Sequence, residues 1–311
     1  MQPPRVVLHP LHPHGVDKAL MAMPGINLEC PEDNEGVASA LRDGAEVLVT
    51  FTWRDEFLTP SLRWVAGTGA GAEQYPHELF EKCGVTLTTA VGVHSITVAE
   101  HAFALVLAMT RRIGEAVRHM AEPTWVPMLA DEISGKKMAI VGLGRIGEEI
   151  ARRALAWDIE VAGVKRRPEN YTGCLENVHG PAELQDLCAW ADILVIAAPA
   201  NEDGSPLVGA KELELLGAGW LVNVGRGTLV DGDALCSAVI EGELRGAGLD
   251  VTTPEPLPAD SPLWSSPKVV LTAHYAGASP YYGERWGKIF SHNLKAFREG
   301  GPWENRLVPK D

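Results

Sequence analysis

Short apolar runs alternate with helix-like segments along almost the whole chain of 311 residues. Many of these runs are continuously apolar and are bounded by Gly or Pro. Such runs are typical of strands buried on both faces in a parallel sheet, and their alternation with helices builds βαβ units. The sequence therefore predicts an α/β fold, and its length suits two domains. The expected strands are Arg5–Leu8, Val47–Phe51, Leu62–Ala66, Val85–Thr88, Met138–Val141, Glu160–Val164, Ile193–Ala197, Trp220–Val224, Gly248–Asp250 and Val269–Thr272.

Two segments have the pattern of long helices. The first, from Ile96 to about Val117, is apolar around most of its circumference, so it must be buried on several sides. It could be a connection between domains that also packs against a second subunit, or a central core helix within one domain. The second, from about Tyr282 to Arg298, follows the last expected strand. It could return the chain to the first domain and so make that domain discontinuous.

The charge and the apolar pattern argue against several classes of partner. With 27 Lys and Arg against 41 Asp and Glu, the formal net charge is −14, which repels the phosphate backbones of nucleic acids. The longest uninterrupted apolar run, Ala102–Met109, is far too short to span a bilayer. The first residues lack the apolar core of a signal peptide. Five cysteines without a Cys-x-x-Cys pair indicate neither a zinc site nor a disulfide framework. We expect a cytoplasmic protein with no metal site, no nucleic acid and no membrane partner.

A glycine motif stands between an expected strand and an expected helix. Gly142-Leu143-Gly144-Arg145-Ile146-Gly147 directly follows the strand that ends at Val141. In this context the first glycine permits a tight turn, the second lets the backbone approach a pyrophosphate, and the third lets the helix pack close to the strand. The amino terminus of the helix then offers its N–H groups to the phosphates. We predict dinucleotide binding here; the alternative is a Gly-rich turn with no ligand.

Three cations at the end of the next strand indicate which dinucleotide binds. Lys165, Arg166 and Arg167 follow Val164, at the distance where an acidic residue would accept the ribose hydroxyls of NAD. Guanidinium groups can bind a 2′-phosphate bidentately. The sequence therefore predicts NADP(H) in preference to NAD(H), and the alternative is a solvated basic turn.

Polar side chains follow three later strands. Arg226 lies between two glycines just past one strand, Glu255 lies in a Pro-rich loop after the strand that ends at Asp250, and His274 follows a third strand. The carboxyl ends of parallel strands meet at one edge of a sheet, where ligands bind. We expect the three side chains to converge. Taken singly, Arg226 could form a buried structural ion pair, Glu255 could be a solvated loop acid, and His274 could be a core histidine.

With these motifs the chain resembles the D-isomer-specific 2-hydroxyacid dehydrogenase family over nearly its whole length. The resemblance implies two Rossmann-like, doubly wound domains with parallel sheets. A dinucleotide-binding domain of residues 97–285, which includes the dimerisation helix, is inserted into a discontinuous, flavodoxin-like substrate-binding domain of residues 1–96 and 286–311. It also implies a homodimer that pairs through the cofactor domains. The matching stretches are Val141–Gly147, Asn223–Asp231, Leu249–Pro256, Thr272–Ser279, Val98–His101 and Asn305–Val308.

The order of Arg226, Glu255 and His274 is similar to the family's catalytic triad, and the residues suit the chemistry. Reduction of a 2-keto acid needs a hydride from the nicotinamide and a proton for the developing alkoxide. His274 would donate that proton, and the carboxylate of Glu255 would stabilise its protonated form. Arg226 would hold the substrate carboxylate and polarise the carbonyl. The expected enzyme is an oxidoreductase, a 2-keto acid reductase whose substrate could be glyoxylate, hydroxypyruvate or a short or branched 2-keto acid.

The resemblance also implies roles for other residues. Asp250 and the backbone near Val224 would hold the nicotinamide amide, and the substrate carboxylate would lie against Ala70 and Gly71, where a flexible turn is the alternative. Trp53 and Arg54 are further candidates for the substrate cleft. Trp125 is expected either to reach the partner subunit or to pack in the core. The full set expected around the cofactor is Gly142, Gly144, Arg145, Ile146, Gly147, Lys165, Arg166, Arg167, Ala198, Pro199, Val224, Gly225, Arg226, Asp250, His274 and Gly277.

The chain departs from the family's pattern at two positions, and two other functions compete with that of a 2-keto acid reductase. Lys165 stands where the family often has an acidic residue, which makes NAD use doubtful, and Ala273 stands where it often has Pro. Transcriptional co-regulators share this fold and sense dinucleotides without turnover, although here the triad is complete. Formate dehydrogenases of the same fold pair the His with Gln, whereas Glu255 stands here.

Overall fold

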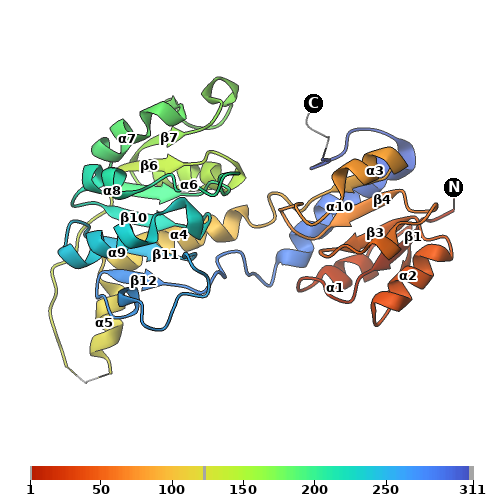
Figure 1. Ribbon diagram of the computed structural model, residues 1–311, viewed down its shortest axis with the longest axis horizontal. Helices are drawn as coiled ribbons and strands as arrows, with labels where there is room; N and C mark the ends of the chain where they lie inside the picture. Colours follow the sequence, from red (N-terminus) through yellow and green to blue (C-terminus); the bar gives the residue numbers. More distant parts are fainter. Residues whose placement is uncertain (1, 122–123, 308–311) are drawn as a thin grey trace. The chain divides into compact units, whose positions relative to one another are not determined.

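The computed structural model describes residues 2–121 and 124–307. The chain divides into two compact units, one made of Met1–His94 and Ala278–Asp311 and the other of Ser95–Gly277 (Figure 1). The boundary expected after residue 285 would cut the last helix, α10 (Tyr282–Glu299). That helix packs as a whole on the sheet of the first unit, so the second crossing between units comes before it.

The first unit is built on a parallel sheet of five strands in the order β2-β1-β3-β4-β5. This is the flavodoxin-like order of doubly wound sheets. Four of the strands match expected apolar runs to within two residues. The short edge strand β2 was not expected, because its residues are polar or only half-buried. The strands are β1 (Arg5–Leu8), β2 (Asn27–Glu29), β3 (Val47–Thr50), β4 (Trp64–Gly67) and β5 (Thr86–Thr88).

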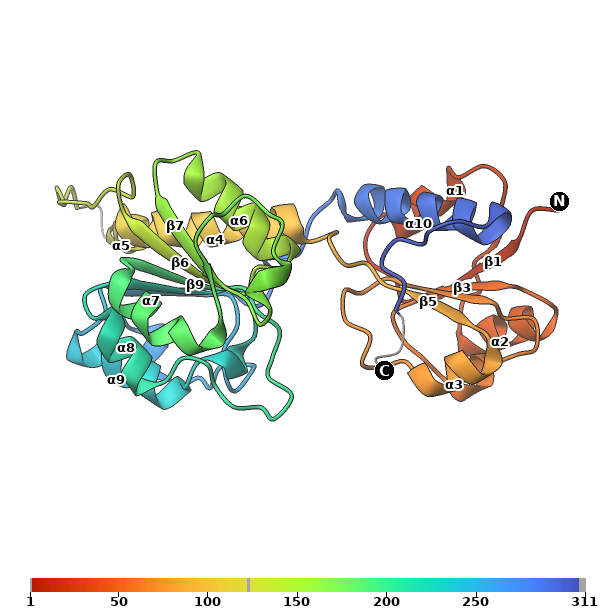
Figure 2. The same cartoon turned by 90° about the horizontal axis from the view of Figure 1, so that it is seen from above.

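Helices cover both faces of this sheet (Figure 2). Helices α1 (Val16–Met21) and α10 lie on one face, and α2 (Asn34–Arg42) and α3 (His77–Cys83) lie on the other. Alternate side chains of β1 belong to two different cores. Val6 and Leu8 pack in the cluster under α10, whereas Val7 packs in the cluster under α2. Continuously apolar strands are thus needed because both faces are buried.

After α10 the chain returns to the edge of the first sheet. The side-chain amide of Asn293 donates to the Glu304 carbonyl at 3.0 Å and its oxygen accepts from the Glu304 N–H at 2.7 Å. Arg306 then pairs with Thr88 in an antiparallel bridge. Val308, at the end of the stretch that resembles the family, lies outside the described residues.

The second unit contains a parallel sheet of seven strands in the order β12-β11-β10-β9-β6-β7-β8. Six of these strands have the order of a dinucleotide-binding Rossmann sheet, and β12 extends it at one edge. The expected strands are present, whereas β8 has only two residues and was not expected. The strands are β6 (Lys137–Val141), β7 (Glu160–Val164), β8 (Val178–His179), β9 (Ile193–Ile196), β10 (Trp220–Asn223), β11 (Gly246–Leu249) and β12 (Val269–Leu271).

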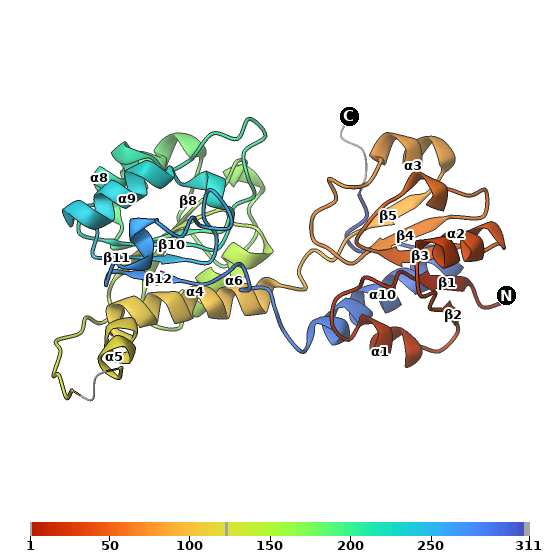
Figure 3. The same ribbon diagram turned by 60° about the horizontal axis from the view of Figure 1, so that its bottom comes forward.

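Helices again lie on both faces (Figure 3). Helices α4 (Ser95–Thr110) and α6 (Arg145–Leu155) cover one face, and α7 (Leu184–Trp190), α8 (Ala210–Leu216) and α9 (Gly232–Glu241) cover the other (Figure 2). Helix α4 packs on α6 and on the strands β10, β11 and β12. It is therefore a core helix of the second unit, which explains why it is apolar around most of its circumference.

The single helix expected from Ile96 to Val117 is two helices, α4 and α5 (Ile113–His119). The hydroxyl of Thr110 donates to the Val106 carbonyl at 3.0 Å, a contact that competes with the helical ladder. Arg112 then has a φ of 56°, which ends α4, and its side chain binds Glu115 at 2.7 Å. Side-chain competition of this kind leaves no mark on the apolar periodicity, so the break was missed.

Among the described residues, no helix combines the length and the apolar character needed to cross a membrane. The same part of the chain contains no cluster of three or more His, Cys, Asp or Glu side chains that could hold a metal ion. All five cysteines are free thiols.

Candidate active site

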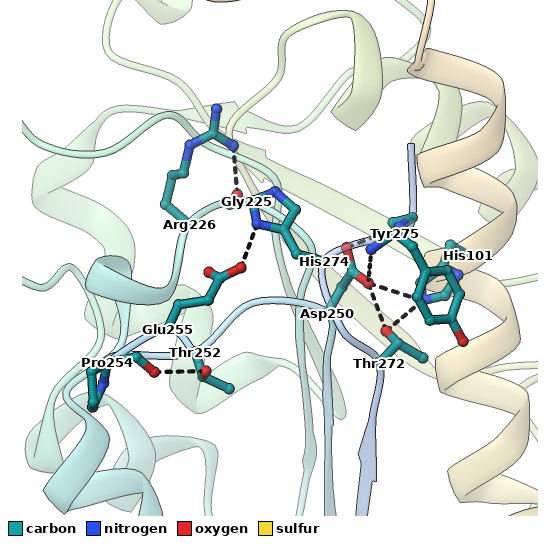
Figure 4. Close-up of polar contacts among 11 residues, drawn as sticks. His101, Gly225, Arg226, Asp250, Thr252, Pro254, Glu255, Thr272, His274 and Tyr275 are labelled. Carbon is teal, nitrogen blue, oxygen red and sulfur yellow. Dashed lines mark hydrogen bonds and ion pairs between the residues drawn. The ribbon is translucent and has the colours of Figure 1, made fainter. Parts of the chain in front are cut away.

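Three polar side chains gather at the carboxyl edge of the second sheet. Arg226 follows β10, Glu255 lies in the loop after β11, and His274 follows β12. Because β10, β11 and β12 are parallel neighbours, their carboxyl ends share one edge. Figure 4 shows the three side chains close to one another at this edge. The convergence expected from the sequence is therefore present in the structure.

His274 and Glu255 form a short hydrogen-bonded pair. The distance from Nδ1 of His274 to Oε1 of Glu255 is 2.6 Å, and their side chains remain 51% and 41% exposed. A carboxylate can only accept, so the proton of this bond belongs to Nδ1. Nε2 is then the ring nitrogen left to exchange a proton with a ligand. The pair is a charge-assisted one whenever the imidazole is protonated.

Asp250 holds the turn that carries His274. Three successive backbone N–H groups donate to this one residue: His274 to its carbonyl at 2.8 Å, Tyr275 to Oδ1 at 3.1 Å and Ala276 to Oδ2 at 3.0 Å. His274 has a φ of 51°, a left-handed conformation that costs a residue with a side chain roughly 1–2 kcal/mol. The three hydrogen bonds offset that cost, so the turn is fixed rather than merely allowed.

The carboxylate of Asp250 is thus directed at groups of its own chain. It also accepts from the Thr272 hydroxyl at 2.7 Å, and Asp250 is only 3% exposed. Sequence reasoning expected Asp250 beside the nicotinamide amide and missed its part in holding the His274 turn. A signal was present, because a carboxylate at the end of an apolar strand is costly to bury unless donors surround it.

The side chain of Asn223 holds the backbone at Gly225 and Arg226, just past the end of β10. The buried amide of Asn223 accepts from the Gly225 N–H at 3.0 Å and donates to the Arg226 carbonyl at 2.9 Å. The Arg226 guanidinium is exposed and donates to the Gly225 carbonyl at 2.8 Å. It makes no ion pair with any carboxylate of the described residues. A buried structural ion pair, the alternative reading of this arginine, is therefore wrong.

The glycine loop has the geometry that a pyrophosphate requires. Gly142 has a φ of 99°, and a Cβ there would lie 2.7 Å from the Ala198 nitrogen; a Cβ on Gly147 would lie 2.1 Å from the Gly142 oxygen. Neither position admits a side chain. Gly144 precedes α6 and has no heavy atom within 4 Å of the place of a Cβ. The backbone is therefore open at the amino terminus of α6, whose first amides have no acceptor within the helix. These residues fit a dinucleotide.

The three cations after β7 are not equivalent. Lys165 is half-buried and its Nζ donates to the Leu143 carbonyl of the glycine loop at 2.8 Å. The side chains of Arg166 and Arg167 are exposed, and neither is bound to another described residue. Lys165 therefore supports the loop, and the two arginines are the groups available to an anion.

Glu148 anchors the segment that follows these cations, and sequence reasoning missed it. The Tyr171 hydroxyl and, at 2.7 Å, the Cys174 N–H both donate to its carboxylate. Burial alone would raise the pKa of Glu148, but these hydrogen bonds outweigh burial and lower it. Burial and the nearby Glu148 raise the pKa of Tyr171. The segment after Arg167 is thus tied to the first turns of α6.

The candidate substrate residues of the first unit follow β3 and β4. Ala70 is exposed and Gly71 half-buried, in the loop after β4. Arg54 is exposed and lies 3.6 Å from Glu56. The Trp53 ring packs edge-on against Phe80 at 4.6 Å, so most of it belongs to the core of that unit.

The comparisons with known proteins agree with this site. A sequence model described as "D-isomer specific 2-hydroxyacid dehydrogenase, NAD binding domain" matches residues 103–276, a region that contains the glycine loop, Arg226, Glu255 and His274. The chain is 35% identical to a glyoxylate reductase of Korarchaeum cryptofilum, over 78% of this chain and 74% of that protein.

The chain belongs to the D-isomer-specific 2-hydroxyacid dehydrogenase family. Another relative within this dehydrogenase family is glyoxylate/hydroxypyruvate reductase B of Pectobacterium carotovorum, 33% identical over 81% of this chain and 80% of that one. A crystal structure of an NADPH-dependent glyoxylate/hydroxypyruvate reductase from Sinorhizobium meliloti has a TM-score of 0.80 to this dehydrogenase, with 28% identity, and the match covers 98% of each chain.

Proposed function

We propose that the chain is an oxidoreductase that reduces a small 2-keto acid to the D-2-hydroxy acid, with NADP(H) as its preferred cofactor. The observation that carries the proposal is the His274–Glu255 hydrogen bond of 2.6 Å, at the same sheet edge as Arg226. An acid, a carboxylate that stabilises its charge and a guanidinium for an anionic substrate are what this reaction needs. The three relatives named above are reductases of glyoxylate or of glyoxylate and hydroxypyruvate.

Each side chain has a distinct role in the proposal. Arg226 binds the substrate carboxylate and polarises the carbonyl oxygen. His274 donates the proton on Nε2 to that oxygen as it becomes an alkoxide, and Glu255, through Nδ1, stabilises the protonated ring beforehand. The bound nicotinamide supplies the hydride. In the first unit, the residues proposed to contact the substrate lie in the loops after β3 and β4: Trp53, Arg54, Ala70 and Gly71.

The preference for NADP(H) rests on Arg166 and Arg167. Their guanidinium groups are the exposed cations at the end of β7, where the ribose of a bound dinucleotide lies in Rossmann folds. Lys165 contributes positive charge while it holds the Leu143 carbonyl. The NADPH-dependent reductase of S. meliloti supports this cofactor. The backbone of Val224 and the residues Ala198, Pro199 and Gly277 complete the cofactor site in the proposal.

A substrate and cofactor panel tests the proposal. We expect oxidation of NADPH that depends on glyoxylate, hydroxypyruvate or a short or branched 2-keto acid, with a lower KM for NADPH than for NADH. An equal or lower KM for NADH would remove the cofactor assignment. Tight nucleotide binding with no turnover of any 2-keto acid would instead favour a dinucleotide sensor of the same fold.

We further propose that the protein is a homodimer that pairs through the second unit. Apolar side chains on α5 and the segment beyond it lie open to solvent, with Trp125 95% and Leu129 92% exposed. Large apolar side chains left open to solvent in one segment support an interface there. Light scattering at micromolar concentration should give the mass of two chains. A single-chain mass would overturn the dimer without touching the proposed chemistry.

A further inference from the structure

A chain of hydrogen bonds connects helix α4 to the turn that carries His274. Nε2 of His101, on α4, lies 2.8 Å from the Thr272 hydroxyl, and that hydroxyl donates to Oδ1 of Asp250 at 2.7 Å. Oδ1 also lies 3.5 Å from Nε2 of His101. Figure 4 shows His101 and Thr272 on the side of Asp250 away from Arg226. All three residues belong to the second unit.

The direction of each proton in this chain follows from its ends. A carboxylate only accepts, so the one hydroxyl proton of Thr272 goes to Asp250. The hydroxyl oxygen must then accept from His101, which requires the proton of His101 on Nε2. The hydrogen bonds therefore all run in one direction, from His101 through the Thr272 hydroxyl to the buried carboxylate of Asp250. The side chain of His101 is 15% exposed, so water does not readily replace this donor.

Asp250 connects these hydrogen bonds to the backbone of the proposed proton donor, His274. Its carboxylate binds the N–H groups of Tyr275 and Ala276, and its carbonyl binds the N–H of His274. His101 also touches the turn directly, because its ring packs edge-on to Tyr275 with 5.3 Å between centroids. Two lines of contact thus lead from His101 to the residues around His274. Donors that orient a buried carboxylate also fix whatever the carboxylate holds.

We propose that His101 is a positioning residue for the reduction: by donating through Thr272 to Asp250, it holds the His274 turn so that Nε2 of His274 meets the substrate oxygen. The inference rests on the proposed function, since it assigns His101 a part in that reaction. His101 touches neither substrate nor cofactor in the proposal, and its effect runs through two other side chains. A small displacement of a catalytic group is enough to slow a reaction roughly 100-fold.

The test compares variants that remove the donor with variants that keep one. His101→Leu and Thr272→Val each break these hydrogen bonds, whereas His101→Gln keeps a side-chain N–H donor and Thr272→Ser keeps the hydroxyl. We expect His101→Leu and Thr272→Val to lower kcat roughly 10- to 100-fold, with KM for the 2-keto acid changed far less and the dissociation constant for NADPH unchanged. His101→Gln and Thr272→Ser should recover most of the lost rate.

A double variant adds an independent check. If His101 acts through Thr272, the rate loss of His101→Leu with Thr272→Val should be close to that of either change alone, because residues in one network are not additive. Thermal unfolding of each variant shows whether it is folded. Thr272→Val is nearly isosteric and keeps the inference testable even if His101→Leu does not fold.

Two results would overturn the inference. One is a wild-type kcat for both His101→Leu and Thr272→Val. The other is an equal loss in His101→Leu and His101→Gln together with a wild-type rate for Thr272→Val, which would show that only the packing of the imidazole matters. An inactive wild-type protein would overturn the proposed function itself, so the two failures are distinct.

Discussion

Nδ1 of His274 lies 2.6 Å from Oε1 of Glu255, although 19 residues separate them in the sequence. The pair exists because β11 and β12 are parallel neighbours whose following loops leave the same edge of the sheet. The carboxylate thereby brings a negative charge to the ring of the proposed proton donor.

Replacing Glu255 by Gln tests that charge. The amide can still accept a hydrogen bond from Nδ1, but it brings no negative charge to the ring. We expect a lower kcat for reduction at pH 7, with the dissociation constant for NADPH unchanged. The measurement is kcat at pH 7 for the variant and the wild type. An unchanged kcat would remove Glu255 from its role.

Loss of His274 should nearly abolish reduction. A positioned general acid contributes roughly 10²–10⁴-fold to the rate, and we expect His274→Ala to lose a factor of this size while its dissociation constant for NADPH stays the same. His274→Asn is a useful second variant, because asparagine tolerates the φ of 51° at this position. A near-normal kcat in both variants would require another proton donor.

Arg226→Ala should affect binding and rate together. The guanidinium is proposed to bind the substrate carboxylate in the ground state and the carbonyl oxygen in the transition state, so we expect a higher KM for the 2-keto acid and a kcat lower by roughly 10²–10³-fold. Arg226→Lys should recover little, because an ammonium cannot form the bidentate contact. A change in KM alone would show that Arg226 binds the substrate without polarising it.

The cofactor preference should change with the cations after β7. Lys165→Asp combined with Arg166→Ala removes positive charge and adds an acceptor for the ribose hydroxyls, so we expect the ratio of kcat/KM for NADPH to that for NADH to fall. Arg152→Ala is the matched control: it removes an arginine from the same unit that is exposed and paired with Glu149 at 2.9 Å. An unchanged ratio in the first variant would refute the proposed phosphate site.

Tyr171→Phe probes the anchor on Glu148 through stability. The lost hydrogen bond to a carboxylate should cost about 1 kcal/mol of unfolding free energy at pH 7, at the low end because the pair is partly exposed. The wild-type pKa of Glu148 is lowered, so this contribution is full above the ordinary range of glutamate and disappears as pH falls through the lowered value. Chemical denaturation at pH 7 and at pH 3 compares the two proteins. An equal difference at both pH values would contradict the assignment.

The sequence could predict what depends on local patterns. Continuously apolar runs found the buried strands, and Arg226, Glu255 and His274 could be placed at strand ends because parallel strands share one edge. The two edge strands β2 and β8 were missed because they are short and half-exposed. Apolar periodicity also continues through the break at Arg112, where a left-handed residue ends α4.

Contacts between residues that lie far apart along the chain could not be predicted from the sequence. The place of Asp250 at the end of an apolar strand indicates that donors surround its carboxylate, but the sequence does not identify them as the amides of Tyr275 and Ala276. The hydrogen bonds from Tyr171 and Cys174 to Glu148 likewise join segments that only the folded chain brings together. The same applies to the hydrogen bond between His101 and the Thr272 hydroxyl, which are 171 positions apart in the sequence. These contacts orient parts of the site, whereas the positions of Arg226, Glu255 and His274 follow from the ends of the strands.

The left-handed backbone of His274 limits how its position can vary. Residues branched at Cβ are excluded there by the backbone alone, whatever their chemistry, and Gly, Asn and Asp are the side chains that this conformation accepts best. An inactive Val or Ile variant would therefore report a collapsed turn, not a missing proton. We expect a homologue that has lost the imidazole but retained the turn to carry one of those three residues at this position. Such a residue would identify, from sequence alone, a protein that keeps the fold without catalysing the reduction.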